Sequence, residues 1–201
     1  MSVTAADVKA LRDRTGAAMM DCKAALTESD GDVERAIEIL RVKGQASASK
    51  RESRGTDEGV VAAYIHANDK VGAMVEVQCE TDFVARNEDF KAFAYEVALH
   101  VAATAPKYVS SEEIPEEERE AERRVFMEKA KEEGKPDNIV EKIVEGQLAK
   151  WAKEVALLDQ SHVNADKHEG ESIEELRQGL AAKTGENVRI ARFAYFRVGE
   201  E

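Results

Sequence analysis

The sequence predicts an α+β protein in which a small helical domain precedes a core with a three-stranded antiparallel sheet, packed helices and a helical hairpin. Two observations predict the sheet: side chains alternate with a period of two in residues 59–79 and again from residue 188 onward. A third observation predicts the rest, because residues 1–44 and 87–185 carry apolar side chains at helical spacing.

The composition is that of a folded protein with a heavily charged surface. Apolar residues make up 43% of the 201 residues and charged residues 35%, and the net charge of -12 opposes nucleic-acid binding. No run of about 18 apolar residues is present, and acidic residues occupy the place of a signal peptide's apolar run. We therefore expect a cytoplasmic protein with no membrane partner and no direct nucleic-acid partner.

Residues 1–44 predict a three-helix domain. Thr4 and Asp7 form a capping box for the first helix, which Gly16 ends. The second helix has apolar residues at a spacing of four, and Asp32 caps a third helix that we expect to end at Gly44. We expect the inward residues of the second helix to be Ala18, Cys22 and Leu26.

Residues 45–58 lack an apolar face and predict a polar linker. Its basic residues Lys50, Arg51 and Arg54 either contact phosphate or belong to a solvated tether. The acidic remainder of the chain favours the tether.

Residues 59–201 predict the α+β core, which also forms a dimerisation domain if the sheet pairs with a second copy. The first two strands join at a hairpin turn, Asn68-Asp69, and the third strand comes from the end of the chain. We expect these side chains on the inward face: Val61, Ala63, Ile65, Val71, Ala73, Val75, Val77, Val188, Ile190, Ala194, Phe196 and Val198. The other face then holds Tyr64, Met74, Phe193 and Tyr195 beside Glu76, Arg189 and Arg197. Such an apolar patch is covered either by a packed helix or by a second copy of the chain.

Helical patterns fill the interval between the second and third strands. Residues 87–105 predict an amphipathic helix that ends at Pro106. Residues 116–133 and 137–158 predict an antiparallel helical hairpin at about 116–158, interrupted by Gly134-Lys135-Pro136. A final helix begins at Ser172 and ends at Gly185.

Motifs of enzymes are absent from the sequence, including Gly-rich phosphate loops, nucleophile elbows and paired-His helix motifs. The histidines at 66, 100, 162 and 168 have no ligand spacing, and His100 is predicted to be a packed, hydrogen-bonded histidine. Cys22 and Cys79 match no redox or metal spacing and are expected to be reduced. We expect no catalytic residue, no metal and no cofactor.

The segment from Cys79 to Asn87 connects an apolar strand to an amphipathic helix, a common place for binding groups. Within it, Asp82 either caps the helix or faces a partner. Phe83 likewise either plugs the core or faces a partner.

Two stretches resemble the signatures of the elongation factor Ts family: Thr81–Asn87, and Leu11–Leu26 near the N-terminus. Four further segments are similar to the family, so the resemblance spans nearly the whole chain. They are His100–Ala103, Glu133–Pro136, Lys142–Gly146 and Leu157–Gln160.

The resemblance implies a ubiquitin-associated-like N-terminal domain and the short, single-core form that dimerises through its sheet. It also implies guanine nucleotide exchange on GDP-bound elongation factor Tu, with binding that lasts until GTP enters. The active complex is then either one-to-one or two-to-two. Thr81, Asp82, Phe83 and Val84 would displace the partner's magnesium site, and Phe83 would be the apolar wedge. Other partner contacts carried over are Arg12, Met19, Met20 and Lys23.

The chain departs from the family pattern after Gln160, where Ser161-His162 and then Asn164-Ala165-Asp166 replace a usual Pro, aromatic and Lys-Asp sequence. The family's partner contacts in this loop are therefore not assigned to residues 161–170 of this chain. Ala194 stands near the place of a cysteine that cross-links a short relative, so any dimer is held by packing.

Two rival functions remain at this point. The chain is either a plain interaction module that leaves GDP dissociation unaltered, or a thiol enzyme that uses Cys79 with a histidine brought near by folding. The sequence supplies no paired base for such a thiol.

Overall fold

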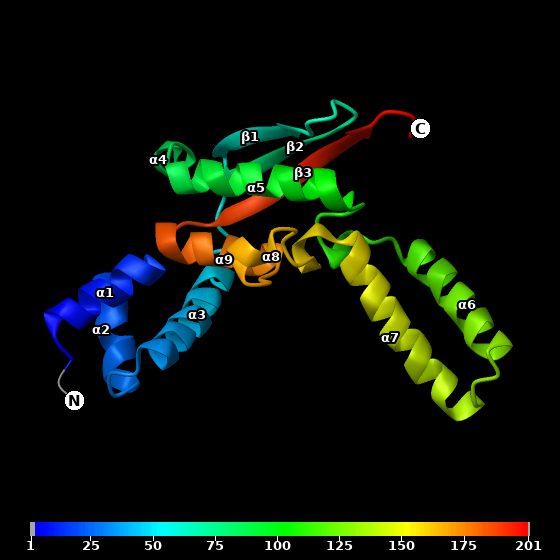
Figure 1. The fold of residues 1–201 in the computed structure, drawn as a ribbon, viewed down its shortest axis with the longest axis horizontal. Helices are drawn as coiled ribbons and strands as arrows, with labels where there is room; N and C mark the ends of the chain where they lie inside the picture. Colours follow the sequence, from blue (N-terminus) through cyan, green and yellow to red (C-terminus); the bar gives the residue numbers. More distant parts are fainter. Residues whose placement is uncertain (1–2, 201) are drawn as a thin grey trace. The chain divides into compact units, whose positions relative to one another are not determined.

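The computed structural model describes residues 3–200 (Figure 1), apart from the side chains of residues 137 and 138. The chain divides into two compact units. Unit 1 comprises the described residues up to Ala62, with Glu76–Ala94 and Glu175–Ile190. Unit 2 comprises Ala63–Val75, Tyr95–Glu174 and the described residues from Ala191 onward. Among the described residues, no helix has the length and apolarity needed to cross a membrane.

The predicted N-terminal helices are α1 (Ala5–Thr15), α2 (Met19–Glu28) and α3 (Val33–Ser49). The Thr4–Asp7 capping box is present, and Gly16 ends α1 with a left-handed φ of 68°. Asp32 accepts a hydrogen bond from the backbone N–H of Arg35 at 3.0 Å, as expected of an N-cap.

Helix α3 continues through Gly44, where the sequence predicted its end, to Ser49. A Cβ on Gly44 would lie 3.1 Å from the Ala182 side chain in unit 1, so this glycine permits close packing. Ala48 is buried, which gives the extra turn an apolar contact.

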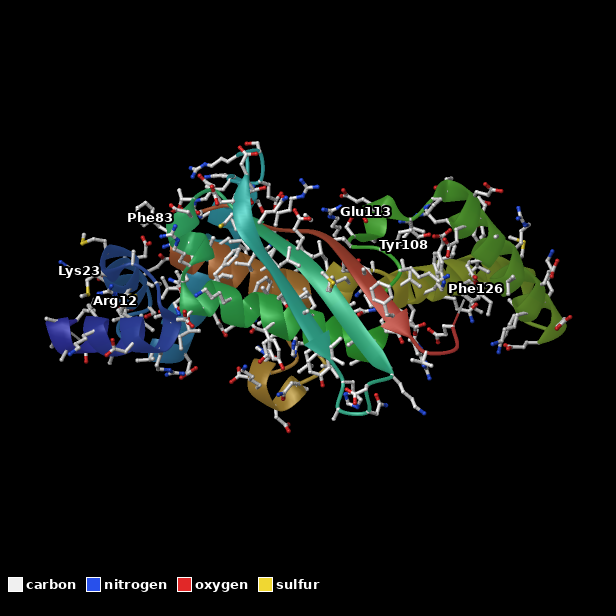
Figure 2. All side chains as sticks on the ribbon, turned by 90° about the horizontal axis from the view of Figure 1, so that it is seen from above. Arg12, Lys23, Phe83, Tyr108, Glu113 and Phe126 are labelled. Atoms are coloured by element: carbon white, nitrogen blue, oxygen red, sulfur yellow. The ribbon has the colours of Figure 1, made fainter. Side chains whose placement is uncertain are left out.

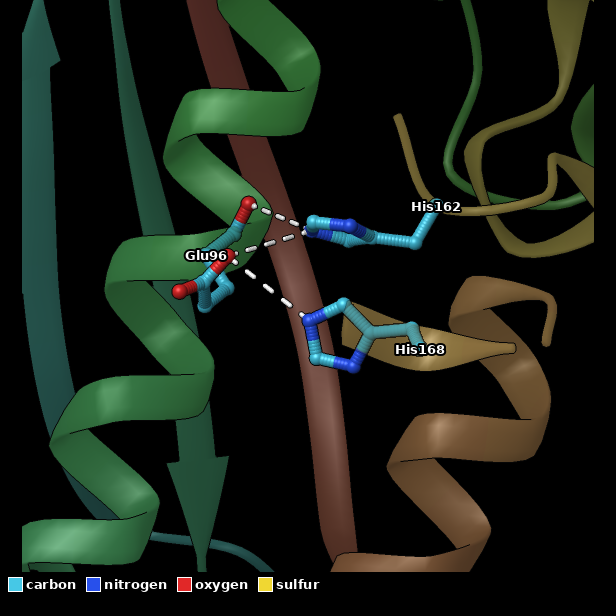
Figure 3. A group of neighbouring side chains, drawn as sticks. All are labelled: Glu96, His162 and His168. Carbon is cyan, nitrogen blue, oxygen red and sulfur yellow. Dashed lines mark hydrogen bonds and ion pairs between the residues drawn. The ribbon is translucent and has the colours of Figure 1, made fainter. Parts of the chain in front are cut away.

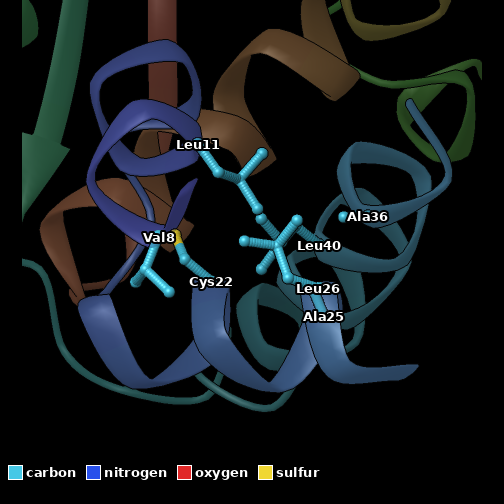
Figure 4. Close-up of a cluster of buried hydrophobic side chains, with 7 residues drawn as sticks. All are labelled: Val8, Leu11, Cys22, Ala25, Leu26, Ala36 and Leu40. Atoms are coloured by element: carbon cyan, nitrogen blue, oxygen red, sulfur yellow. The ribbon is translucent and has the colours of Figure 1, made fainter. Parts of the chain in front are cut away.

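Seven buried side chains hold the three helices together (Figure 4). They are Val8, Leu11, Cys22, Ala25, Leu26, Ala36 and Leu40. A helical domain of about 45 residues is close to the lower size limit for independent folding. Its stability therefore depends on each of these buried side chains.

The sheet contains β1 (Glu58–Ile65), β2 (Val71–Cys79) and β3 (Val188–Arg197) in the order β1-β2-β3. Backbone bonds from His66 N to Val71 O and from Val198 N to Lys70 O bring the ends of β1 and β3 to the start of β2. Both pairings are therefore antiparallel, as predicted.

The predicted inward face is correct for β2 and wrong for β1 and for most of β3. Ala73, Val75 and Val77 are buried, but Val61, Ala63 and Ile65 are exposed, and Tyr64 instead packs edge-on against Tyr95 with ring centroids 5.9 Å apart. Both faces of β1 carry apolar side chains, so its period of two does not say which face is covered.

In β3 the alternation of burial shifts by one residue after Ile190. Val188 and Ile190 are buried, but the half-buried positions that follow are odd-numbered: Ala191, Phe193 and Tyr195. Ala194, Phe196 and Val198, which were predicted inward, are exposed. The sequence predicted four apolar residues on the second face of the sheet, namely Tyr64, Met74, Phe193 and Tyr195. Of these, only Met74 lies on the exposed face, which we call the open face.

Helix α4 (Asp82–Ala85) follows β2, and α5 (Glu88–Thr104) then runs along the sheet (Figure 1). Helices α6 (Glu116–Glu132) and α7 (Asp137–Val155) form the predicted hairpin, packed through Ala130, Val140 and Val144. The phenyl ring of Phe126, labelled in Figure 2, packs against this hairpin cluster. The remaining elements are η1 (Ser111–Glu113), η2 (Leu157–Asp159), α8 (Ala165–His168) and α9 (Ile173–Thr184).

We predict that Leu26→Ala destabilises the three-helix cluster by about 2–5 kcal/mol, because it removes a fully buried side chain and leaves a cavity. Hydrogen exchange of the α1–α3 amides measures this loss. The control is Val42→Ala on exposed α3 surface, expected to change stability by less than about 0.5 kcal/mol. Equal protection in the two variants would contradict the prediction.

Candidate functional site

A corner between strand and helix carries the candidate site. Strand β2 ends at Cys79, and α4 forms a single helical turn with bonds from Ala85 N to Thr81 O and from Arg86 N to Asp82 O. Thr81 is the N-cap residue in an extended conformation, but its hydroxyl makes no capping bond. The hydroxyl instead donates to the Glu186 carboxylate at 2.6 Å.

Asp82 and Phe83 both face outward from this corner. The Phe83 side chain is 83% exposed, so it does not plug the core (Figure 2). Asp82 lies within the first turn, so it is not the N-cap, and its half-exposed carboxylate pairs with Arg86 at 3.1 Å. Val84 is half-buried and Ala85 is buried, which fixes the opposite side of the turn.

The thiol of Cys79 lies beneath the corner. It is buried and donates to the Thr81 carbonyl at 3.2 Å. Burial, with the nearby negative charges of Glu186 and Glu58, raises the pKa of the thiol to about 11. A thiol of this kind stays protonated at neutral pH, so its environment opposes a nucleophilic role.

The four predicted partner-binding residues of the N-terminal helices are all exposed. Met19 is 45% exposed and Met20 is 71% exposed, whereas Cys22 points into the helical cluster. Arg12 and Lys23 are exposed as well (Figure 2). Both methionines therefore lie outside the core of the helical cluster.

Folding gathers three histidines that the sequence spacing does not connect. His100 and His162 stack with ring centroids 5.4 Å apart, and His168 meets His162 edge-on at 4.2 Å. Glu96 faces this group from α5: its carboxylate lies 3.5 Å from His162 Nε2 and 3.7 Å from His168 Nε2 (Figure 3). The other carboxylate oxygen pairs with Lys167. These separations resemble the spacing of ligands around a metal.

The tautomer of His162 argues against a metal at this place. The backbone N–H of Asn164 donates to His162 Nδ1 at 3.1 Å, so the proton of the neutral ring is on Nε2, the atom that faces Glu96. A metal ligand must lose that proton, and moving it to Nδ1 would set it against the Asn164 N–H. The arrangement fits a packed hydrogen-bonded cluster better than a metal site.

His100 has the environment predicted for it. It is fully buried, accepts from Val163 N–H through Nδ1 at 3.0 Å and bonds Gln160 Oε1 through Nε2 at 2.8 Å. Burial lowers the pKa of the imidazole to about 4, and the hydrogen bond to Gln160 offsets only part of this effect.

Comparison with known proteins identifies the family of the chain. A family model described as Elongation factor TS matches residues 4–169. The protein named Elongation factor Ts from Geobacter sulfurreducens is 49% identical over 200 residues, which covers 100% of this chain and 91% of that protein. The chain belongs to the elongation factor Ts family.

Two further relatives with that name match over almost their full length. The one from Syntrophus aciditrophicus is 51% identical over 201 residues, covering 100% of this chain and 98% of that protein. The one from Pseudothermotoga lettingae is 49% identical over 201 residues and both chains are covered completely. The family comprises nucleotide exchange factors for elongation factor Tu and not catalytic enzymes, so the chain is a translation elongation factor that acts by binding.

We expect His100 to make stability fall as the pH drops from about 6.5 toward 4. In that window the unfolded chain binds a proton at this residue and the folded chain does not, because the folded pKa is lowered. The loss attributable to His100 is on the order of 2 to 3 kcal/mol.

Urea unfolding at pH 7 and pH 4.5, for the unaltered chain and for His100→Gln, measures this difference. The variant should have a shallower pH dependence, whereas Val42→Ala, at an exposed position on α3 that carries no titratable group, should keep the original one. Parallel pH curves for the unaltered chain and His100→Gln would rule out the assignment.

Proposed function

We propose that the chain expels GDP from elongation factor Tu by pressing Phe83 and Asp82 against the partner's magnesium site. The observation that carries this proposal is the 83% exposure of the Phe83 ring at the tip of a one-turn helix. Leaving an aromatic ring in water forfeits its burial energy, so such a ring is a natural contact for a partner.

The physical basis is the strict coordination of magnesium. Mg²⁺ requires near-octahedral geometry and binds through few protein ligands, so a small displacement of those ligands weakens the hold on the ion and on GDP. If the factor weakens the affinity of elongation factor Tu for GDP, thermodynamic linkage requires GDP to weaken the affinity for the factor to the same extent. The factor consequently stays bound after GDP leaves and departs when GTP binds.

The remaining predicted residues divide into two roles. Thr81 and Val84 hold the turn that presents Asp82 and Phe83. On the N-terminal helices, a separate exposed set grips the nucleotide-binding domain of the partner: Arg12, Met19, Met20 and Lys23. The net charge of -12 favours a protein partner over direct nucleic-acid contact, and a cytoplasmic location follows from the role in translation.

The open face of the sheet supports a homodimer, and with it a two-to-two complex. Exposed apolar side chains gather there, and part of the face is hollowed beside Gly72. The exposed residues are Ile65, Met74, Phe196 and Val198, with exposed fractions between 48% and 72%. A sheet face of this character is self-complementary across a two-fold axis, which is the commonest symmetry of soluble oligomers.

We predict that Phe83→Ala leaves complex formation largely intact but slows stimulated GDP release by about tenfold or more, a loss of roughly 1.4 kcal/mol of transition-state stabilisation. Stopped-flow fluorescence of a labelled GDP on elongation factor Tu measures the release rate. Because Phe83 makes few contacts within its own chain, the variant should fold normally.

The matched control is Val125→Ala, which removes an exposed apolar side chain from α6 and should leave the release rate unchanged. An undiminished rate in Phe83→Ala would remove the wedge role. If the unaltered chain binds the partner without accelerating GDP release at all, the plain interaction module is the correct function.

Replacing Phe196 by Asp is expected to convert the dimer to a monomer, because two buried carboxylates would face one another across the two-fold axis. Sedimentation equilibrium of the purified chain gives the mass. Val163→Asp, at an exposed position away from the strands, serves as the control and should stay dimeric. A monomeric mass for the unaltered chain would exclude the dimer.

A further inference from the structure

Glu186 contacts the corner from a distant part of the chain within unit 1. Gly185 ends α9 in a left-handed conformation, with φ at 76°, and Glu186 and Asn187 then lead into β3. One carboxylate oxygen of Glu186 accepts from the backbone N–H groups of Glu80 at 3.1 Å and Thr81 at 3.0 Å. The other oxygen accepts the Thr81 hydroxyl at 2.6 Å.

A second carboxylate completes the contact in the reverse direction. Glu80 accepts from the backbone N–H of Asn187 at 2.6 Å and pairs with Arg54 at 3.3 Å. The Asn187 amide group, almost fully buried, donates to the carbonyls of Glu52 at 3.3 Å and Arg54 at 3.0 Å. The corner is thereby bonded both to the start of β3 and to the segment that follows α3.

These bonds satisfy backbone N–H groups at the corner. The N–H groups of Glu80 and Thr81 lie between β2 and α4, and the Glu186 carboxylate satisfies both. Bonds from N–H groups to an ionised carboxylate are shorter and stronger than neutral ones. Without that acceptor, two partly buried donors would lose their partner at the residue where the chain changes direction.

We propose that Glu186 is a positioning residue for nucleotide exchange. Its carboxylate holds Thr81 in the extended N-cap conformation, and that conformation aims the single turn of α4 so that Phe83 and Asp82 project outward. The inference rests on the proposed function of those two residues.

The argument for positioning follows from what else holds α4. The helix has four residues, only Ala85 among them is buried, and the Phe83 ring is almost free of contacts within its own chain. Packing alone therefore constrains the direction of the ring weakly. A corner that samples several directions reduces the fraction of molecules ready for exchange, and the rate falls with that fraction.

Glu186→Ala is expected to lower the maximal rate of stimulated GDP release by about tenfold, with a smaller effect on the affinity for elongation factor Tu. Glu186→Gln should recover most of the rate. Its carbonyl oxygen still accepts both backbone N–H groups, and its amide N–H₂ donates to the Thr81 hydroxyl oxygen, which accepts equally well.

A double-mutant cycle separates positioning from general destabilisation. If Glu186 acts by presenting the ring, Glu186→Ala should add little to the defect of Phe83→Ala, so the two losses should not add. Additive losses, or a Glu186→Ala rate equal to that of the unaltered chain, would overturn the proposal.

Hydrogen exchange gives a readout that does not depend on exchange activity. The amides of Glu80 and Thr81 should exchange at least about tenfold faster in Glu186→Ala, and should be unaffected in Glu145→Ala, which removes an ion pair with Arg123 on the hairpin. Unchanged protection of the two amides in Glu186→Ala would refute the anchoring. If the unaltered chain fails to accelerate GDP release, the proposed function fails, while this measurement still decides whether Glu186 anchors the corner.

Thermal unfolding of each variant establishes that the assays are made on folded protein. Should Glu186→Ala not fold, Glu186→Asp takes its place, because it keeps the charge but shortens the side chain by one methylene group. The shortened carboxylate cannot reach both the amides and the hydroxyl, so it should show the same slow release and the same faster amide exchange.

Discussion

The pairing of β2 with β3 is the constraint on which the candidate site depends. It brings the end of an early strand beside the beginning of the last one, and so places Glu80 and Thr81 within hydrogen-bond distance of Glu186 and Asn187. The buried side of β2, with Ala73, Val75 and Val77, holds the register. A slip of one residue would expose that face. It would also break both carboxylate contacts, that of Glu186 with the corner and that of Glu80 with Asn187.

The corner shows how a protein keeps an exposed aromatic ring in one direction. Phe83 gains almost no burial in its own chain, so packing of the ring itself contributes little to its orientation. The bonds that Glu186 supplies are charge-assisted and local, and they leave the ring itself free for a partner. Rigidity at the base and exposure at the tip are compatible because different groups provide them.

The histidine cluster illustrates a different outcome of folding. His162 and His168 come from a loop where the chain departs from its family pattern, and they pack against Glu96 and His100. Backbone N–H groups that donate to His100 and His162 set the tautomers of those two rings, and the tautomer of His162 suits packing better than metal binding. The distances among Glu96, His162 and His168 suggest a set of metal ligands. The Asn164 N–H that donates to His162 Nδ1 indicates a packed cluster instead.

The sequence by itself determined the longer helices, the three strands and the family, because these depend on capping residues, on periodicity and on local motifs such as Thr81–Asn87. It also indicated the outward corner. Only the tertiary structure decided which face of β1 is covered, since both faces are apolar, and where β3 changes phase after Ile190. Glu186 was missed for a different physical reason: its partners lie 105 and 106 positions away, and hydrogen bonds between distant segments leave no periodic trace in a sequence.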